Sequence, residues 1–400
     1  MSNRYGGMLV PLGALVSRIG NEMAGTAILL FAYANATQGE STAAFGLLSV
    51  AAAAGGPVLG VWIDRVPSAA PLTLSLMVFA VGLVAIGVSL HNDVGAVATL
   101  VALVAGLFAP AVAGGWSASL TSGDPVRGRR LALFDASSYS IAGLVGPLLA
   151  ALAYAVAGRS APLVVTVALL LAGSACSPWT RTASTVRASG LRAEAPATHP
   201  WIDLRRGFAS IIHRPRLRWA TSSSVIAFFG FGVFSAIVPT IGATQFGTPA
   251  GAGIVLGVMA GCALVSNAIL SRRGELKRPS TVLALGTVTV GVGLILMLIP
   301  SPAAALVAAA IIGTGDGPLL AALLHIRHLE APARLRTQVF TTGASLKITA
   351  SGLGALAAIP LMSGGLSLPL LVAAGVHLIA AALAGLATDP LSGHGATAAK

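Results

Sequence analysis

Four charged residues interrupt long apolar stretches of the sequence. They are Arg18, Glu22, Asp316 and Lys347. An ionised side chain at the centre of a membrane-spanning helix costs about 2.5 to 3.5 kcal/mol on insertion scales, so each of these residues needs a functional or structural reason. A carboxyl group among apolar side chains can exchange a proton. We therefore take these four residues as candidates for proton coupling and for a polar ligand cavity.

Arg18 and Glu22 are four positions apart, which places both on one face of a helix. Apolar surroundings favour the neutral form of Glu22, whereas the nearby Arg18 favours its ionised form. These opposing effects predict that Glu22 carries a proton and that Arg18 adjusts its acidity. The alternative is that the two charges only neutralise one another.

Asp316 lies between Gly315, Gly317 and Pro318. Glycine and proline inside an apolar stretch predict a locally broken helix, whose free backbone groups would join the Asp316 carboxyl in a polar site. Lys347 lies nearer the end of its stretch. A structural pair, or snorkelling of its ammonium group to the membrane surface, is therefore the alternative for Lys347.

The composition indicates a protein that resides in a membrane. Hydrophobic residues make up 56% of the chain and charged residues only 9%, with a mean hydropathy of +0.88. Soluble domains, by contrast, contain about a quarter charged residues. Apolar segments of about 20 residues, the length that spans a bilayer, recur along the chain. We place twelve transmembrane helices near 9–33, 43–62, 70–90, 95–119, 131–157, 160–179, 218–243, 250–270, 280–299, 302–325, 339–362 and 367–388.

Basic residues fall almost entirely on alternate connections between these helices. Arg65, Arg127, Arg327 and Arg334 are examples, whereas only Arg159 falls on the opposite set. By the positive-inside rule the basic side is cytoplasmic. We expect a multi-pass protein of the cell inner membrane with both termini in the cytoplasm. The same arginines account for the net charge of +12, so nucleic acid is not an expected partner.

One long polar segment divides the array. We expect an N-terminal six-helix bundle over 1–180, a cytoplasmic linker over 181–217, a C-terminal six-helix bundle over 218–390 and a cytoplasmic tail over 391–400. Trp201, Leu204 and Phe208 repeat at helical spacing within the linker. They predict an amphipathic helix on the cytoplasmic leaflet or, alternatively, a solvated connector helix.

The two halves of the sequence also repeat. An offset of 207 positions superimposes Pro125, Arg127 and Arg129 on Pro332, Arg334 and Arg336, Arg65 on Arg272, and Gly46 on Gly253. Five matches in one register predict two related bundles with pseudo-symmetry. The expected fold class is thus an all-α integral membrane protein.

The segment 60–65 reads Gly-Val-Trp-Ile-Asp-Arg at the end of the second span. It resembles the G-x-x-x-D-R signature between spans 2 and 3 of the major facilitator superfamily, although the pattern departs from the family after Arg65. The resemblance implies that Gly60, Asp64 and Arg65 form part of a gate that latches the two halves on the cytoplasmic side. We expect Asp135, near the start of span 5, at the same gate or at a helix end.

Span 5 is similar to the G-x-x-x-G-P-x-x-G stretch of proton antiporters in this superfamily. Gly146 and Pro147 match the central pair, whereas alanines replace the outer glycines. Gly143, Gly146 and Pro147 are expected to form an antiporter-like bend or, alternatively, only to permit tight helix packing. The arginine that antiporters carry in span 4 is absent.

The resemblance implies that spans 1, 4, 7 and 10 line a central cavity, with Arg18, Glu22 and Asp316 facing it. The favoured function is proton-coupled secondary transport of a small organic solute by alternating access, with export favoured over import. One alternative is a proton symporter that imports a sugar, a nucleoside or an organic acid. The other is a non-transporting membrane sensor with the same fold.

No residue pattern indicates an enzyme, a cofactor or a metal site. Cys176 and Cys262 lie in apolar stretches without the spacing of metal ligands, and the glycine-rich run 313–318 does not follow a strand as a nucleotide loop would. We expect a monomer whose partners are a small solute, protons and the lipid bilayer.

Overall fold

The computed structural model describes residues 2–33, 38–66, 68–120, 125–180, 200–272, 276, 278–332 and 336–387, and its regular elements there are all helical. In chain order these are α1 (Ser2–Tyr33), α2 (Gln38–Arg65), α3 (Ala70–His91), α4 (Gly95–Phe108), α5 (Pro110–Ser119), α6 (Pro125–Ala157), α7 (Ala161–Cys176), η1 (Ser177–Thr180), α9 (Pro200–His213), α10 (Pro215–Phe246), α11 (Gly251–Arg272), α12 (Pro279–Leu296), α13 (Pro302–Glu330), α14 (Arg336–Leu361), η3 (Met362–Gly364) and α15 (Ser367–Leu386). Each predicted span overlaps one of these helices or a consecutive pair.

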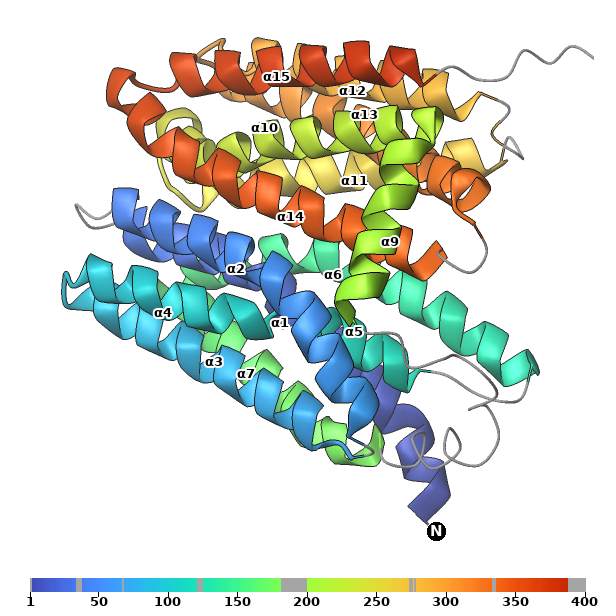
Figure 1. Ribbon diagram of the computed structural model, residues 1–400. Helices are drawn as coiled ribbons and strands as arrows, with labels where there is room; N and C mark the ends of the chain where they lie inside the picture. Colours follow the sequence, from blue (N-terminus) through green and yellow to red (C-terminus); the bar gives the residue numbers. More distant parts are fainter. Residues whose placement is uncertain are drawn as a thin grey trace, which may run out of the picture.

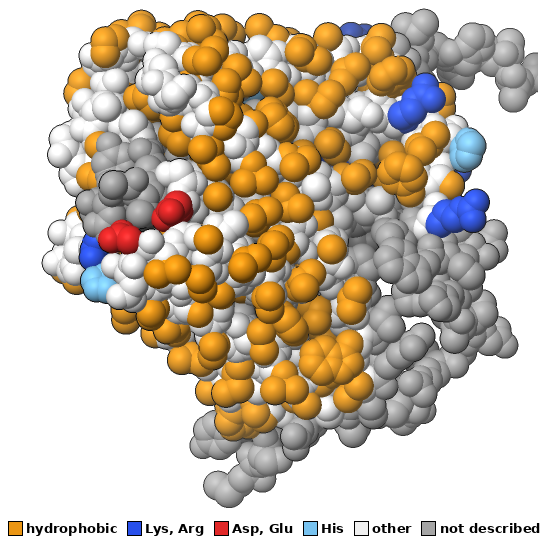
Figure 2. Space-filling view, turned by 60° about the vertical axis from the view of Figure 1, so that its left-hand side comes forward, with side chains coloured by type: hydrophobic (Ala, Val, Ile, Leu, Met, Phe, Trp, Pro, Cys, Tyr) orange, Lys and Arg blue, Asp and Glu red, His pale blue; other side chains and the backbone are white. Residues whose placement is uncertain are grey.

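The outer surface of the molecule suits a bilayer. In the part of the chain that the structure describes, nine helical segments are long and apolar enough to cross a membrane. Figure 2 shows hydrophobic side chains over the middle of the face in view, with most of its charged side chains toward the left-hand and right-hand ends. The chain is therefore a multi-pass membrane protein. Helices α1, α2 and α6 are not among the nine, so the count of twelve spans stays a prediction.

The helices form two groups, which we call the N-terminal half (α1 to α7) and the C-terminal half (α10 to α15). Helices within each half pack mainly on one another, and Figure 1 shows the blue-to-green half below the yellow-to-red half. One core cluster belongs to the N-terminal half alone. A second cluster joins Met23 and Leu30 of α1 to residues of α10 through α15, so it bridges the two halves.

The fourth predicted span consists of two helices in the structure. Helix α4 ends at Phe108 and α5 begins at Pro110. Proline has no backbone N–H to continue the hydrogen-bond ladder, but it suits the first turn of a new helix. The break therefore follows from Pro110. It separates the apolar α4 from α5, which carries Trp116 and Ser117.

The sequence predicts a helix within the linker, and helix α9 lies there. It runs across the array near the beginning of α10 (Figure 1). Ile211 is buried in a small cluster with Leu217, Ala331 and Val339, whereas Phe208 and Ile212 are exposed. Helix α9 thus packs on the C-terminal half through one face and leaves apolar side chains free on another. Its position on a membrane leaflet and the domain boundaries given above stay predictions.

We call the end of the molecule that carries α9, Arg272 and Arg278 the basic end, and the end that carries His91 and Arg159 the opposite end. The two halves approach most closely toward the opposite end. A Cβ atom added to Gly46 of α2 would lie 2.7 Å from Leu356 of α14. Gly253 of α11 meets Ala151 of α6 in the same way. Only glycine permits such close helix approach.

The contacts of Gly46 and Gly253 also explain one match of the internal repeat. These two residues are equivalent at the offset of 207, and each packs its helix on the other half of the molecule. Farther toward the basic end, a Cβ atom added to Gly143 of α6 or to Gly261 of α11 would meet no heavy atom within 4 Å. The halves therefore touch at the opposite end and diverge along these helices toward the basic end.

Candidate functional site

Arg18 of α1 is buried in the N-terminal half and is neutralised there. Its Nη2 atom lies 2.6 Å from Oδ1 of Asp135 in α6 and donates to Oγ of Ser117 in α5 at 2.9 Å. Nη1 donates to Oγ of Ser138. The Tyr139 ring covers the guanidinium, with 3.9 Å between Cζ and the ring centroid. We call this set the Arg18 cluster.

The Arg18 cluster corrects the expectation that Arg18 and Glu22 neutralise one another, because Arg18 pairs with Asp135. An effect of Arg18 on the acidity of Glu22 stays a prediction. Ser117 also donates to both carboxylate oxygens of Asp135, at 3.1 and 2.9 Å, so the charge pair has its own hydrogen bonds. The pair joins residues 117 positions apart, which helical spacing along α1 cannot reveal. All of these partners of Asp135 belong to the N-terminal half. Asp135 therefore does not join the halves here, and its part in a gate stays a prediction.

Glu22 has no ion-pair partner among the residues that the structure describes. Its side chain is exposed, and its hydrogen bond comes from Nδ2 of the neighbouring Asn21, 3.4 Å from Oε1. Ile19 and Met23, beside it on α1, pack in the core cluster that bridges the two halves. Glu22 therefore presents a free carboxyl group at the border between the N-terminal and C-terminal halves.

The antiporter-like stretch of α6 packs directly on this part of α1. A Cβ atom added to Gly146 would lie 2.8 Å from Cβ of Glu22, so the two helices touch at this point. Pro147 follows inside α6, where it removes one backbone donor. Gly143 instead faces open space. Close packing at Gly146 is thus observed, and an antiporter-like bend stays a prediction.

Asp316 lies in an unbroken helix, so the expectation of a local break in span 10 is wrong. Helix α13 continues from Pro302 to Glu330 through the glycines and Pro318. A Cβ atom added to Gly315 would lie 2.6 Å from the Gly286 carbonyl oxygen of α12, and one added to Gly317 would lie 2.5 Å from the Ala263 carbonyl oxygen of α11. The glycines serve close packing with two neighbouring helices, and α13 continues through them although Pro318 removes one backbone donor.

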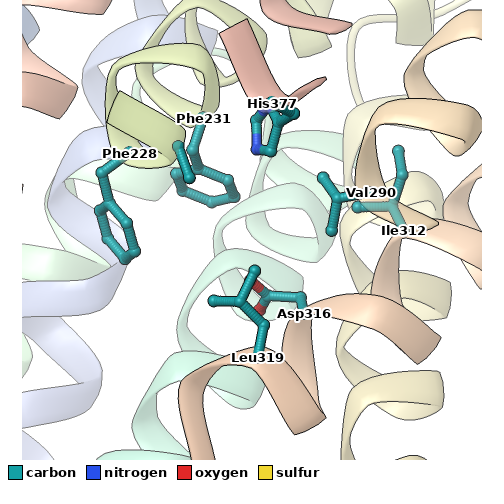
Figure 3. A pocket seen from close by; sticks show the side chains of 8 residues that line it. Phe228, Phe231, Val290, Ile312, Asp316, Leu319 and His377 are labelled. Atoms are coloured by element: carbon teal, nitrogen blue, oxygen red, sulfur yellow. The ribbon is translucent and has the colours of Figure 1, made fainter. Parts of the chain in front are cut away.

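Asp316 borders a small cavity of the C-terminal half (Figure 3). Phe228 and Phe231 of α10 and His377 of α15 also line it, and Asp316 points into it from α13. Its volume of about 20 Å³ can hold one water molecule. The cavity therefore combines one carboxyl group and one imidazole with aromatic walls.

His377 is a cavity residue that the sequence analysis missed. It is buried, and its Nδ1 atom lies 2.8 Å from the Ala373 carbonyl oxygen. Because a carbonyl oxygen only accepts, Nδ1 donates this hydrogen bond, and Nε2 remains for another partner. A single histidine inside the apolar run of α15 was the signal available in the sequence.

Lys347 and Arg327 lie close to this cavity. Nζ of Lys347, on α14, is 4.1 Å from the centroid of the Phe228 ring, and Lys347 is near enough to Asp316 and Arg327 to interact electrostatically with both. The sequence analysis placed Arg327 on a connection, but α13 extends beyond it and only 1% of the residue is exposed. Its spacing of eleven residues from Asp316, three helical turns, was the signal for a shared face.

The residues of the gate signature are only partly described. Gly60, Asp64 and Arg65 lie in the last turns of α2, but their side chains are outside the described part of the structure. The latch between the two halves therefore stays a prediction. Among the described residues, no group of histidine, cysteine, aspartate and glutamate has the arrangement of a metal site.

Comparisons with known proteins agree with this architecture. The chain resembles a POT peptide transporter solved with alafosfalin, at 15% identity and a TM-score of 0.69 over 95% of this chain and 93% of that one. An auto-inhibited POT family peptide transporter matches at 14% identity and a TM-score of 0.70, over 96% of each chain. The POT family transporter PepTSo matches at 12% identity and a TM-score of 0.70, over 96% of this chain and 97% of that one.

At these identities, the solved structures establish a shared fold. No curated protein matches the sequence. The sequence profile of the Major Facilitator Superfamily, however, matches residues 12–346, which is most of the chain. The resemblance inferred from the 60–65 signature and the repeat is thereby confirmed. With its membrane-spanning helices and two packed halves, this chain belongs to the Major Facilitator Superfamily of membrane transporters.

Proposed function

We propose that the protein is a proton-coupled secondary transporter of a small organic solute, with export favoured, and that Glu22 carries the coupling proton. One observation supports this assignment above the others. Glu22 is an exposed carboxyl group at the border between the halves with no ion-pair partner among the described residues, whereas the neighbouring Arg18 is already neutralised by Asp135. A free carboxyl group in that position can gain and lose a proton as the halves move.

The arrangement of the halves supports a cycle of alternating access. They touch through glycines toward the opposite end and diverge toward the basic end. By the positive-inside rule the basic end faces the cytoplasm, so the described conformation opens inward. Separation of the halves at the Gly46 and Gly253 contacts, with closure at the basic end, would then expose Glu22 to the other side. A cysteine introduced at Arg127 should therefore resist impermeant thiol reagents in intact cells.

Export is favoured by the contact between Gly146 and Glu22. In the superfamily, the stretch that Gly146 and Pro147 resemble marks proton antiporters, and here it packs on the proposed proton carrier. Import of a sugar, a nucleoside or an organic acid by symport is the second candidate. The solved structures reported above are of peptide transporters, so peptides belong in the panel of solutes. The two candidates differ in whether solute and proton move in opposite directions or in the same direction.

The experiment is transport by purified protein in vesicles that contain a pH-sensitive dye. A panel of organic solutes is supplied under imposed pH gradients of either sign. Antiport predicts that inward movement of solute carries protons outward. Symport predicts that inward movement of solute carries protons inward. Glu22→Gln should abolish accumulation against a gradient. Asp93→Asn, which removes an exposed loop carboxyl group from a left-handed position that asparagine tolerates, is the matched control.

A transporter should lose coupling with Glu22→Gln while downhill exchange of solute remains measurable. If the Glu22→Gln variant accumulates solute as well as the parent, Glu22 is structural and the proposed coupling role is wrong. A non-transporting sensor would show no solute-dependent proton movement with the parent protein for any member of the panel.

A further inference from the structure

Arg327 is a buried cation that has no acidic partner among the residues whose side chains the structure describes. It is 1% exposed, and its Nε and Nη2 atoms have no hydrogen-bond partner in the described part of the protein. The next acid along α13 is Glu330, but its Oε1 atom lies 3.2 Å from Nη1 of Arg216 and is thus already engaged. Buried charges in proteins are almost always paired, so Arg327 has donors available for a ligand.

The Arg327 guanidinium lies on the same face of α14 as Lys347. A Cβ atom added to Gly343 would lie 2.5 Å from both Cζ and Nη2 of Arg327, so the guanidinium occupies the place of a side chain at position 343. Positions 343 and 347 are one helical turn apart, with about 5 to 6 Å between their Cβ positions. Two cations are therefore stacked along one face of α14.

The position of Lys347 connects this pair of cations to the cavity. Its ammonium group lies over the Phe228 ring, which lines the cavity that Asp316 borders. Asp316 interacts electrostatically with Lys347, but the two form no ion pair within 4.0 Å in the described structure. Lys347 and Arg327 thus carry two positive charges near the single carboxyl group that interacts with Lys347, and an additional anion would balance them.

We propose that Lys347 and Arg327 form an anion-binding site that takes a carboxylate or phosphate group. The planar guanidinium offers two free donors in the fork geometry that suits such groups, and the flexible Lys347 ammonium supplies a second charge. Because the Phe228 ring lies beside the Lys347 ammonium group and offers an apolar contact, we expect the ligand to be an organic anion. The further statement that this anion is the transported solute rests on the proposed function.

Two sources could supply the anion: a soluble organic acid or the phosphate group of an anionic lipid. The test uses detergent-purified protein without any proton gradient and measures its thermal unfolding by intrinsic fluorescence. Benzoate and inorganic phosphate are the soluble probes, at ionic strength matched with sodium chloride. Benzamide has the shape of benzoate without its charge and is the ligand control. Nanodiscs with and without phosphatidylglycerol form the lipid arm.

We expect benzoate, but not benzamide, to raise the unfolding midpoint of the parent protein in a saturable manner. Lys347→Gln and Arg327→Gln should each weaken the benzoate affinity about tenfold or more, because each removes a charge-assisted hydrogen bond. Lys347→Arg and Arg327→Lys should retain part of the affinity. Arg272→Gln, which removes an exposed arginine at the basic end, should leave it unchanged.

Protection by phosphatidylglycerol alone, lost in both glutamine variants, would support the site and assign it to a lipid headgroup. No protection by any of these anions would overturn the proposal, as would protection that folded glutamine variants share with the parent. Because binding is measured without transport, it can persist when proton-driven transport is absent. That result would reject the proposed function and leave the anion site standing.

Discussion

Each half of the molecule contains a buried arginine, and the two arginines differ in their partners. In the N-terminal half, Arg18 is held by Asp135, two serines and a tyrosine ring. In the C-terminal half, Arg327 is equally buried, but two of its nitrogen atoms have no partner in the described part of the chain, and Lys347 lies beside it. Arg18 is therefore neutralised within its own half, whereas Arg327 and Lys347 are the groups that we propose for ligand binding.

The internal repeat shows how this difference arises. At the offset of 207, Asp135 of α6 corresponds to Thr342 of α14, so the acid that neutralises Arg18 has no counterpart in the second half. Around α1 and α6, the N-terminal half places Arg18 with two carboxyl groups, Asp135 and Glu22. Around its cavity, the C-terminal half places Arg327 and Lys347 with the carboxyl group of Asp316. Glu22, the carboxyl group not used by Arg18, and the two cations Arg327 and Lys347 thus lie in different halves.

The largest expected effect is that of Glu22 on proton-driven transport. Glu22→Gln should reduce proton-driven accumulation of solute by about a hundredfold or more, because a neutral amide cannot carry a proton through the cycle. Asp316→Asn should alter solute affinity more than coupling. Uptake and exchange in vesicles separate these effects. A coupling defect in Asp316→Asn with normal coupling in Glu22→Gln would reverse the roles assigned to the two halves.

Replacing Arg18 or Arg327 and measuring the stability of each variant tests whether the two buried arginines differ in their partners. Arg18→Met should destabilise the protein by about 2 to 4 kcal/mol, because Asp135 then remains largely buried without its cation. Arg327→Met leaves no acid unpaired, so the ligand-free variant should be at least as stable as the parent. Thermal and denaturant unfolding in detergent measures both. Equal losses of stability would show that Arg327 has a structural partner too.

A smaller effect is expected from the contact between α6 and α1. Gly146→Ala should destabilise the protein by about 1 to 3 kcal/mol, because the added methyl group meets the Glu22 backbone and Cβ. Gly143→Ala is the matched control one turn earlier in α6. It faces open space and should gain up to about 1 kcal/mol from the higher helix propensity of alanine. Similar responses in both variants would argue against a tight contact at Glu22.

The smallest expected effect concerns Gly46 and Gly253, the equivalent glycines through which each half packs on the other. Gly46→Ala and Gly253→Ala should each widen the opposite end by an amount that spin-label distances between α2 and α14 or between α6 and α11 can detect. Each added Cβ atom meets the partner helix of the other half. Gly261→Ala, which meets nothing within 4 Å, should leave the distances unchanged. Different responses of the two repeat-related glycines would show that the contacts are not equivalent.

Much of the fold follows from the sequence alone. Apolar segments of bilayer length, punctuated by proline and arginine, predict the helices and their order, because helix formation in a membrane depends on local hydrophobicity. The 60–65 signature and the repeat identify the superfamily, which the sequence profile confirms. The sequence also marks Arg18, Glu22, Asp316 and Lys347 as unusual, since a charge inside an apolar run needs no structure to be noticed.

The tertiary structure alone decides which of these charges meet. Arg18 turns to Asp135 instead of Glu22, although Glu22 is nearer along the chain, because α6 brings its carboxylate against α1. The glycines around Asp316 serve packing on α11 and α12 instead of breaking α13. Arg327 becomes a buried residue because α13 continues past the expected span. Contacts between helices depend on how separate faces are brought together, and local spacing within one helix carries no record of that arrangement.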